Sequence, residues 1–277
     1  MTNLSSFIEQ TAAAFQAAGI ESSQVDAELL IAFDIGVSRG QLQAMAFQGE
    51  AFEPSKKLIE FIERRTNREP LQHLTGKAYF RNLTLEVGKG VFIPRPETEA
   101  VVEIALDFLR DKPAAKVLDV GTGSGAIAIS IATELNLEVD AIEKSTLAAA
   151  YAQKNIEANL AKVNLLVGDF REQPLELGSY DLVISNPPYI PNSAIPIDPE
   201  VRDHDPDMAL YGGEDGLDLI REIVDLGWLL LKPSGMLALE HADGQSDSVR
   251  ELLLENWLKP RVHPDPTGRL RAVSAIR

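Results

Sequence analysis

The first 75 residues carry apolar side chains at helical spacing. Between residues 4 and 18, one helical face is formed by Leu4, Phe7, Ile8, Ala14, Phe15 and Ala18. The segment "PSKKLIEFIERRTN" likewise places Leu58, Phe61, Ile62 and Arg65 on one side. We therefore expect four or five short helices in a small domain over residues 1–75, and small helical domains of enzymes often recognise substrates.

The pattern changes at about residue 76. The stretch "YFRNLTLEVGKG" alternates with period two and predicts a short β-hairpin, and "TEAVVEIALDFLR" after it predicts an amphipathic helix. Six apolar runs then alternate with helical segments: "KVLDV", "EVDAIE", "VNLLVGD", "YDLVISN", "GMLALE" and "RAVSAI". This alternation predicts an α/β domain over residues 76–277, with a parallel sheet and helices on both faces.

Composition narrows the chemistry. The 277 residues are 45% hydrophobic and 25% charged, which is typical of a globular protein with a full core. The absence of cysteine excludes disulfides, thiolate nucleophiles and cysteine-based zinc sites. The four histidines are scattered without metal-ligand spacing. We expect no metal.

The net charge and the N-terminal sequence indicate which partners and which cellular location to expect. The net charge of −16 argues against a surface that holds a long polyanion, so protein or small-molecule partners are expected rather than stable nucleic-acid binding. The start of the chain lacks the features of a signal or transit peptide, and no apolar run approaches the roughly 18 residues of a membrane span. We expect a cytoplasmic protein that makes no membrane contact.

In α/β sheets ligands bind beyond the carboxyl ends of the strands. The first such end, "VLDVGTGSGAIAI", has Asp119 closing the strand and the loop Gly121-Thr122-Gly123-Ser124-Gly125 leading into a helix. Glycines here let backbone amides approach a nucleotide, and the loose dinucleotide pattern G-x-G-x-x-G/A is also met, so the loop alone leaves NAD open. The carboxylate of Asp119 would repel a pyrophosphate, whereas it suits the ammonium of S-adenosylmethionine (SAM).

The next two strand ends supply further candidate ligand contacts. Glu143 follows the loop by roughly 20 residues, where an acidic side chain accepts hydrogen bonds from ribose hydroxyls. Asp169 could meet the adenine amino group. Phe170 could pack on the adenine ring, although a place in the core is an equal alternative.

The fourth strand end is the most informative. It delivers Asn186-Pro187-Pro188-Tyr189 to the same edge of the sheet, and the two prolines stiffen the loop. The side-chain carbonyl of Asn186 and the backbone carbonyl of Pro187 could grip both hydrogens of a planar NH2 group, with the Tyr189 ring against its plane. The tetrad therefore predicts a clamp for an NH2-bearing substrate.

Four segments together resemble one family. "EPLQHLTGKAYF", "FIPRPETE", "DVGTGSG" and "SNPPYIP" are similar to the release-factor glutamine methyltransferases, the PrmC/HemK family, and the resemblance extends over nearly the whole chain. It implies a Rossmann-like, class I SAM-dependent methyltransferase sheet with a small N-terminal helical domain for substrate recognition. It also implies methyl transfer from SAM to the glutamine side-chain amide in the Gly-Gly-Gln motif of class-one peptide chain release factors, the proteins of translation termination.

The resemblance also assigns residues. It implies SAM contacts at Gly121 to Gly125, Glu143, Phe170 and Asn186, catalysis by Asn186, Pro187 and Tyr189, and substrate binding by these residues with Pro188. Phe92 and the segment after it would line the methionine end. Glu143 and Phe170 stand where aspartate and tryptophan are commoner in the family.

Alternatives stay open from the sequence. A glutamine of a ribosomal protein could replace the release factor, and the same tetrad serves methyltransferases of adenine or guanine amino groups, which should carry a basic track or an added domain. A non-catalytic SAM-binding protein is the third possibility. We expect a monomer. The basic run Lys56, Lys57, Arg64, Arg65 and Arg68 is expected to be a solvated helix face.

Overall fold

A computed structural model describes residues 2–277 and divides into two compact units. One contains the residues up to Gly76 together with Pro196–His204, and the other contains Lys77–Ile195 and Asp205–Arg277. The first unit thus includes a segment that begins only seven residues after the tetrad ends at Tyr189. We describe each unit separately.

The helical unit is built from short capped helices. They are α1 (Leu4–Ala17), α2 (Ser23–Ile35), α3 (Arg39–Phe47), α4 (Lys56–Thr66), α5 (Leu71–Thr75) and α9 (Pro199–His204), beside the small strand pair β1 (Thr2–Asn3) and β2 (Ala51–Phe52). Asn3, Ser38 and Ser55 cap the starts of α1, α3 and α4 with their side chains. The apolar faces enclose one core around Phe15 and Leu30. The five helices before residue 76 agree with the sequence prediction.

One part of the predicted solvated face is wrong. Arg65 is buried at 2% exposure, where its Nε donates to Asp26 Oδ2 at 2.9 Å and its Nη2 pairs with Glu200 Oε1 at 2.8 Å. Arg68 pairs with Glu200 and with Asp198. The carboxylates on α9 and before it lie more than 100 residues downstream, so local sequence could not reveal them. Ion pairs therefore hold α9 within the helical unit.

The second unit begins with the predicted hairpin, β3 (Lys77–Phe80) paired with β4 (Leu83–Glu86). A seven-stranded sheet follows in the order β10-β11-β9-β8-β5-β6-β7. Its strands are β5 (Val117–Val120), β6 (Val139–Glu143), β7 (Val163–Val167), β8 (Tyr180–Ser185), β9 (Leu231–Glu240), β10 (Leu258–Pro264) and β11 (Leu270–Ile276). The five from β5 to β9 are parallel.

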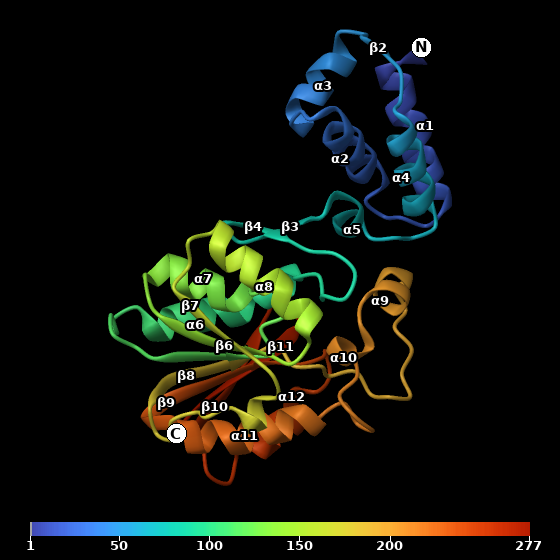
Figure 1. Ribbon diagram of the computed structural model, residues 1–277. Coiled ribbons are helices and arrows are strands. Elements are labelled where there is room, and N and C mark those ends of the chain that lie inside the picture. The colour runs from blue at the N-terminus through green and yellow to red at the C-terminus, as the bar shows by residue number, and fades with distance from the viewer. Residues whose placement is uncertain (1) are drawn as a thin grey trace. The chain divides into compact units, whose positions relative to one another are not determined.

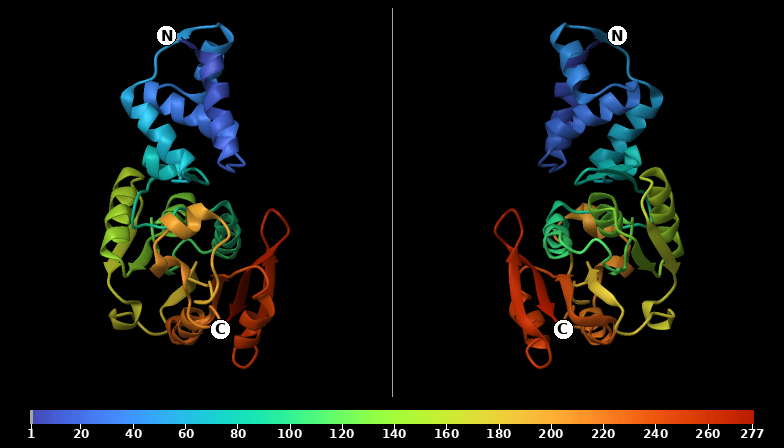
Figure 2. Two further views of the ribbon diagram at one scale, coloured as in Figure 1. Left: turned by 90° about the vertical axis from the view of Figure 1, so that its right-hand side faces the viewer. Right: turned by 90° about the vertical axis from the view of Figure 1, so that its left-hand side faces the viewer.

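Helices cover both faces of this sheet, as Figures 1 and 2 show. One face packs against α6 (Glu99–Leu109), α7 (Ala126–Leu135) and α8 (Thr146–Ala158), and the other against α11 (Asp218–Leu230) and α12 (Ser246–Leu252). Successive strand residues join opposite cores: Val117 and Leu182 belong to the first, Leu118 and Val183 to the second. This alternation is why these strands are apolar throughout.

The predicted all-parallel sheet needs one correction. β11 runs antiparallel to β9, and β10, which the sequence did not predict, pairs antiparallel with β11 at the edge. Only five residues separate β10 from β11, too few for the crossover that parallel strands need. β10 is largely exposed and contains proline. Its sequence also lacks the apolar alternation by which a strand is recognised.

The order of the strands in the sheet determines where the candidate site residues lie. β5 pairs with β6 on one side and with β8 on the other, so β6 and β7 are added to one side of β5 and β8 and β9 to the other, and the strand order reverses at β5. Such a reversal opens a crevice beyond the carboxyl ends of the two central strands. The glycine loop follows β5 and the tetrad follows β8, and Ser185 Oγ donates to Val120 O at 2.6 Å across their ends. Loop and tetrad therefore leave the sheet side by side.

Candidate active site

The glycine loop turns the chain from β5 into α7. Gly121, Gly123 and Gly125 all have left-handed backbone, with φ of 74°, 59° and 88°. At Gly125, the residue before α7, a Cβ atom would lie 2.8 Å from Ile129 Cδ1 in the first turns of that helix, and the left-handed backbone also favours glycine there. Open space lies beside Gly121 and Gly123. The loop offers a backbone surface that a ligand can approach.

Asp119 is fully buried beneath this loop. Its Oδ2 accepts from Thr122 Oγ1 at 2.6 Å and from the Ala128 amide at 3.2 Å, while Oδ1 has no partner among the described residues. Burial raises the pKa of Asp119 to about 7, opposed by these hydrogen bonds and reinforced by Glu143. A buried carboxyl with one unused oxygen and a raised pKa fits a cationic ligand group.

Glu143 closes β6 opposite the loop. Its Oε2 accepts from the Gly123 amide at 2.8 Å and its Oε1 from the Ser145 amide at 2.7 Å. Each carboxylate oxygen keeps a second lone pair. Glu143 therefore shapes the loop in addition to the ribose contact expected of it.

Asp169 and Phe170 lie at the end of β7. The carboxylate of Asp169 contacts Arg171 and, at 3.0 Å, Lys144, and its hydrogen bond with Arg171 holds the pKa of Asp169 well below its usual range. An adenine amino group would have to compete with these cations. Phe170 is a buried member of the second core cluster, 8% exposed, so little of its ring is open to a ligand.

The tetrad leaves β8 with its members in different environments. Asn186 is half-buried, and its Nδ2 donates to Thr98 Oγ1 at 3.0 Å. Pro187 is buried. The Tyr189 hydroxyl donates to Glu240 Oε1 at 3.3 Å, and burial raises the pKa of Tyr189, which keeps the phenol neutral. The side-chain carbonyl of Asn186 lies on the opposite side of its amide from Thr98.

A glycine-rich turn over residues 211–216 packs against the tetrad. In "YGGEDG", the Gly212 amide donates to Ile190 O, and a Cβ on Gly212 would lie 2.5 Å from Pro188 O. Gly216 packs as closely on Tyr189 O, which also accepts from Gln245 Nε2 at 3.0 Å. The turn therefore packs closely against the backbone carbonyls of Pro188 and Tyr189.

Thr98 and Glu240 are site residues that the sequence reasoning missed. They are 3% and 2% exposed. Thr98 ends the short helix η1 (Pro96–Thr98), within the "FIPRPETE" segment, and Glu240 is the last residue of β9. An acidic residue closing an apolar strand was a usable signal for Glu240, whereas nothing local distinguished Thr98.

Phe92 lies earlier in the same segment. It is half-buried, and the guanidinium of Arg95 lies over its ring at 5.2 Å from the centroid. Arg95 Nη2 also pairs with Asp205 Oδ2 at 2.6 Å. These contacts hold the segment that presents Thr98 to the tetrad. Contact of Phe92 with a ligand stays a prediction.

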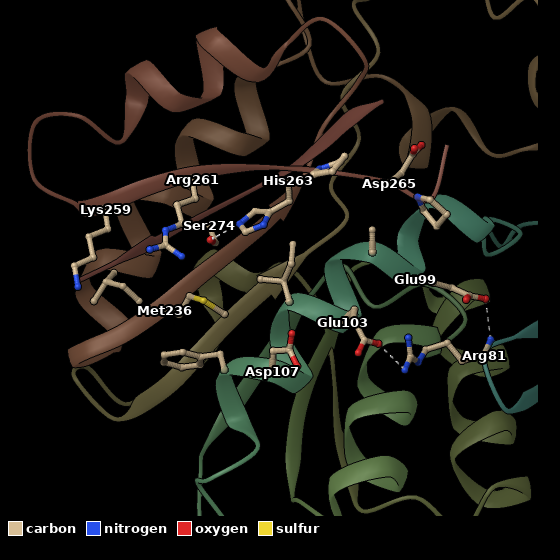
Figure 3. A pocket seen from close by; sticks show the side chains of 16 residues that line it. Arg81, Glu99, Glu103, Asp107, Met236, Lys259, Arg261, His263, Asp265 and Ser274 are labelled. Carbon is tan, nitrogen blue, oxygen red and sulfur yellow. Dashed lines mark hydrogen bonds and ion pairs between the residues drawn. The ribbon is translucent and has the colours of Figure 1, made fainter. Parts of the chain in front are cut away.

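A groove of about 810 Å³ lies elsewhere on this unit, between α6 and the β10–β11 hairpin. Figure 3 shows acidic side chains of α6 on one wall and basic side chains of β10 on the other: Glu99, Glu103 and Asp107, and Lys259, Arg261 and His263. Its lining includes none of the predicted site residues, so it is separate from the strand-end site.

Residues 2–277 contain neither a candidate metal-ligand cluster nor a candidate membrane-spanning helix. No group of three His, Asp or Glu side chains there is arranged to hold a metal ion. No helix within that range is both long and apolar enough to cross a membrane.

Comparison with known proteins gives consistent names over the whole chain. Residues 6–76 match the family described as PrmC N-terminal domain, and residues 82–197 match Methyltransferase small domain. A release factor glutamine methyltransferase of Streptomyces coelicolor is 43% identical over 93% of this chain and 92% of its own. Proteins of the same name from Mycolicibacterium smegmatis and Deinococcus radiodurans are 43% and 37% identical, each over at least 98% of both chains.

Solved structures support the fold. A methyltransferase from Pyrococcus furiosus superimposes with a TM-score of 0.52 at 21% identity, covering 70% of this chain and 88% of that chain. At this identity the likeness establishes a shared architecture. Together with the family match over residues 82–197, this places the parallel strands β5 to β8 in a methyltransferase domain.

Proposed function

The chain belongs to the family of release factor glutamine methyltransferases, and we propose on that premise that Asn186 to Tyr189 hold the substrate glutamine while the loop after β5 holds SAM. The enzyme methylates the side-chain amide of a release factor glutamine, with SAM as the methyl donor. The observation that carries the residue assignment is the pairing of β5 with β8, which brings loop and tetrad together at one edge.

The loop residues fit SAM chemically. The unpartnered Oδ1 of Asp119 suits an ammonium group, and the open space at Gly121 and Gly123 suits a ligand lying on the backbone. Glu143 keeps lone pairs for ribose hydroxyls. When bound, SAM supplies an electrophilic methyl group. The proposed binding set is completed by Thr122, Ser124, Gly125, Asp169, Phe170, Asn186 and Phe92.

The tetrad acts by positioning. An amide nitrogen is a poor nucleophile because its lone pair is delocalised. Positive charge grows on it as the N–C bond forms and the bond from the methyl group to sulfur breaks, which leaves that electron pair on the sulfur. Acceptors at Asn186 Oδ1 and Pro187 O would hold both N–H groups, stabilise that charge and aim the lone pair at the methyl group. Tyr189 and Pro188 would flank the amide plane. The methylated nitrogen then loses its proton to water, so no strong base is required.

The substrate is more narrowly proposed as the Gly-Gly-Gln glutamine of class-one release factors. The helical unit would contact the release factor, the acidic net charge of −16 disfavours stable nucleic-acid binding, and the enzyme would act as a monomer in the cytoplasm, where translation ends. Methylation of a ribosomal protein or of nucleic-acid amino groups is the competing outcome in the following test.

Four possible acceptors separate these substrates: a class-one release factor, its Gly-Gly-Ala variant, ribosomes and total RNA, each incubated with the enzyme and labelled SAM. We expect label in the intact release factor alone, with mass spectrometry placing one methyl group on the glutamine. Label in RNA or ribosomes, or equal label in the Gly-Gly-Ala variant, would overturn the proposed substrate.

Asp119 makes SAM binding depend on pH. Its pKa of about 7 in the free protein should fall when an ammonium group binds, so SAM should bind more tightly to the ionised form and release protons on binding. The affinity measured by calorimetry should therefore fall about tenfold from pH 7.5 to pH 6. Asp119→Asn should bind more weakly at pH 7.5 and show a nearly flat profile. An unchanged slope in that variant would remove Asp119 from the proposal.

A further inference from the structure

A line of polar side chains leads from Asn186 into the protein interior. Asn186 Nδ2 donates to Thr98 Oγ1 at 3.0 Å, and the Thr98 side chain lies beside the carboxyl of Glu240, whose pKa it lowers as a hydrogen-bond donor. The Tyr189 hydroxyl reaches the same carboxyl from the other side. Thr98 and Glu240 are almost completely buried, so water does not offer them alternative partners. Glu240 Oε2 is buried without a hydrogen-bond partner among the described residues, so it is an acceptor toward which the Thr98 hydroxyl can turn.

The chemistry of the carboxylate sets the direction of these hydrogen bonds. Ionised Glu240 can only accept, so the single hydroxyl proton of Thr98 points toward it. The Thr98 oxygen then faces Asn186 as an acceptor, which only the NH2 end of the Asn186 amide can satisfy. The carbonyl end, Oδ1, is thereby turned away from Thr98.

We propose that Thr98 and Glu240 are positioning residues that fix the Asn186 amide with Oδ1 toward the substrate. This inference rests on the proposed function, since it matters only if Asn186 accepts from an NH2 group. If the Asn186 amide were rotated by 180°, its NH2 group would face the NH2 group of the substrate glutamine. Two donors would then meet without an acceptor. Thr98 and Glu240 would thus decide whether the tetrad attracts or repels its substrate.

The groups around Glu240 add a pH dependence. Besides Thr98 and Tyr189, the charges of Arg271 and Glu97 act on it. Burial is the largest effect and raises the pKa of Glu240 to about 7, against the hydrogen bonds and the positive charge of Arg271. A protonated Glu240 can donate to Thr98 and so release the Asn186 orientation. Turnover at saturating substrates should therefore fall as the pH drops below about 7.

The matched pair Thr98→Val and Thr98→Ser tests this. Valine keeps the shape and removes the hydroxyl, whereas serine keeps the hydroxyl. We expect kcat on the release factor to fall at least tenfold in Thr98→Val and to recover to within about threefold in Thr98→Ser, with SAM affinity unchanged in both. In Glu240→Gln the low-pH fall of kcat should disappear. Equal defects in the valine and serine variants, or full activity in Thr98→Val, would overturn the inference.

A second readout does not depend on turnover. The side-chain NH2 protons of Asn186, labelled with 15N and identified by their loss in Asn186→Asp, should exchange slowly in the wild type and in Thr98→Ser and rapidly in Thr98→Val. Fast exchange in the wild type would refute the positioning role. If the protons are protected but the wild type fails to methylate a release factor, the proposed function fails and the hydrogen-bond line stands.

Discussion

Asn186→Ala should lower kcat on the release factor by about 10²–10³-fold, equivalent to about 3–4 kcal/mol of transition-state stabilisation. The reason is that alanine removes an acceptor whose hydrogen bond strengthens as positive charge grows on the substrate nitrogen. The Thr98 hydroxyl also loses its donor, which anchors the loop end. SAM affinity should change by no more than a few-fold, because the Asn186 side chain is committed to Thr98 and the proposed substrate clamp.

Single-turnover kinetics and calorimetry of SAM binding would measure the two effects separately. Asn192→Ala is the matched control: Asn192 lies three residues beyond Tyr189 in the same loop, is exposed, and is held through its backbone amide to Gly213 O. That variant should keep wild-type kcat. A parallel loss of kcat and SAM affinity in Asn186→Ala would show that Asn186 serves SAM binding and not the transition state.

Arg65→Met should destabilise the helical unit by about 3–5 kcal/mol, because it leaves the buried carboxylate of Asp26 without a cation and Glu200 with Arg68 alone. Asp26 and Glu200 both pair with Arg65, and the side chain of Arg65 is only 3% exposed. Hydrogen exchange of the α2 and α4 amides is the appropriate measurement, since a chain of two units need not unfold in one step. Exchange there should accelerate by at least about 10²-fold.

The neighbouring Arg64 provides the control. Its side chain is 40% exposed and pairs with Glu69 at the surface, so Arg64→Met should cost less than about 1 kcal/mol. Combining Arg65→Met with Asp26→Asn and Glu200→Gln should restore much of the stability, because no uncompensated charge is then buried. If the triple variant is no better than Arg65→Met, lost packing and not lost charge balance is the cause.

The order of helices and strands could be predicted because the pattern of apolar residues within each segment indicates its secondary structure. The apolar runs that became β5, β6, β8 and β9 are buried on both faces, so their composition alone marks them as strands. β10 escaped prediction because an exposed edge strand gains its order from pairing with β11, not from burial of its own side chains. The direction of β11 followed from the same pairing.

The sequence by itself indicated the reaction chemistry of this protein: a glycine loop at the first strand end and an Asn-Pro-Pro-Tyr tetrad at the fourth, where parallel strands expose ligand sites. Only the tertiary structure decided what surrounds them. Thr98 lies 88 residues before its hydrogen-bond partner Asn186, and Glu240 lies 51 residues after its partner Tyr189. Helix α9 joins the helical unit through the ion pair of Glu200 with Arg65. Local periodicity and propensity act over a few residues, whereas buried hydrogen bonds and ion pairs form between any residues that the fold brings together.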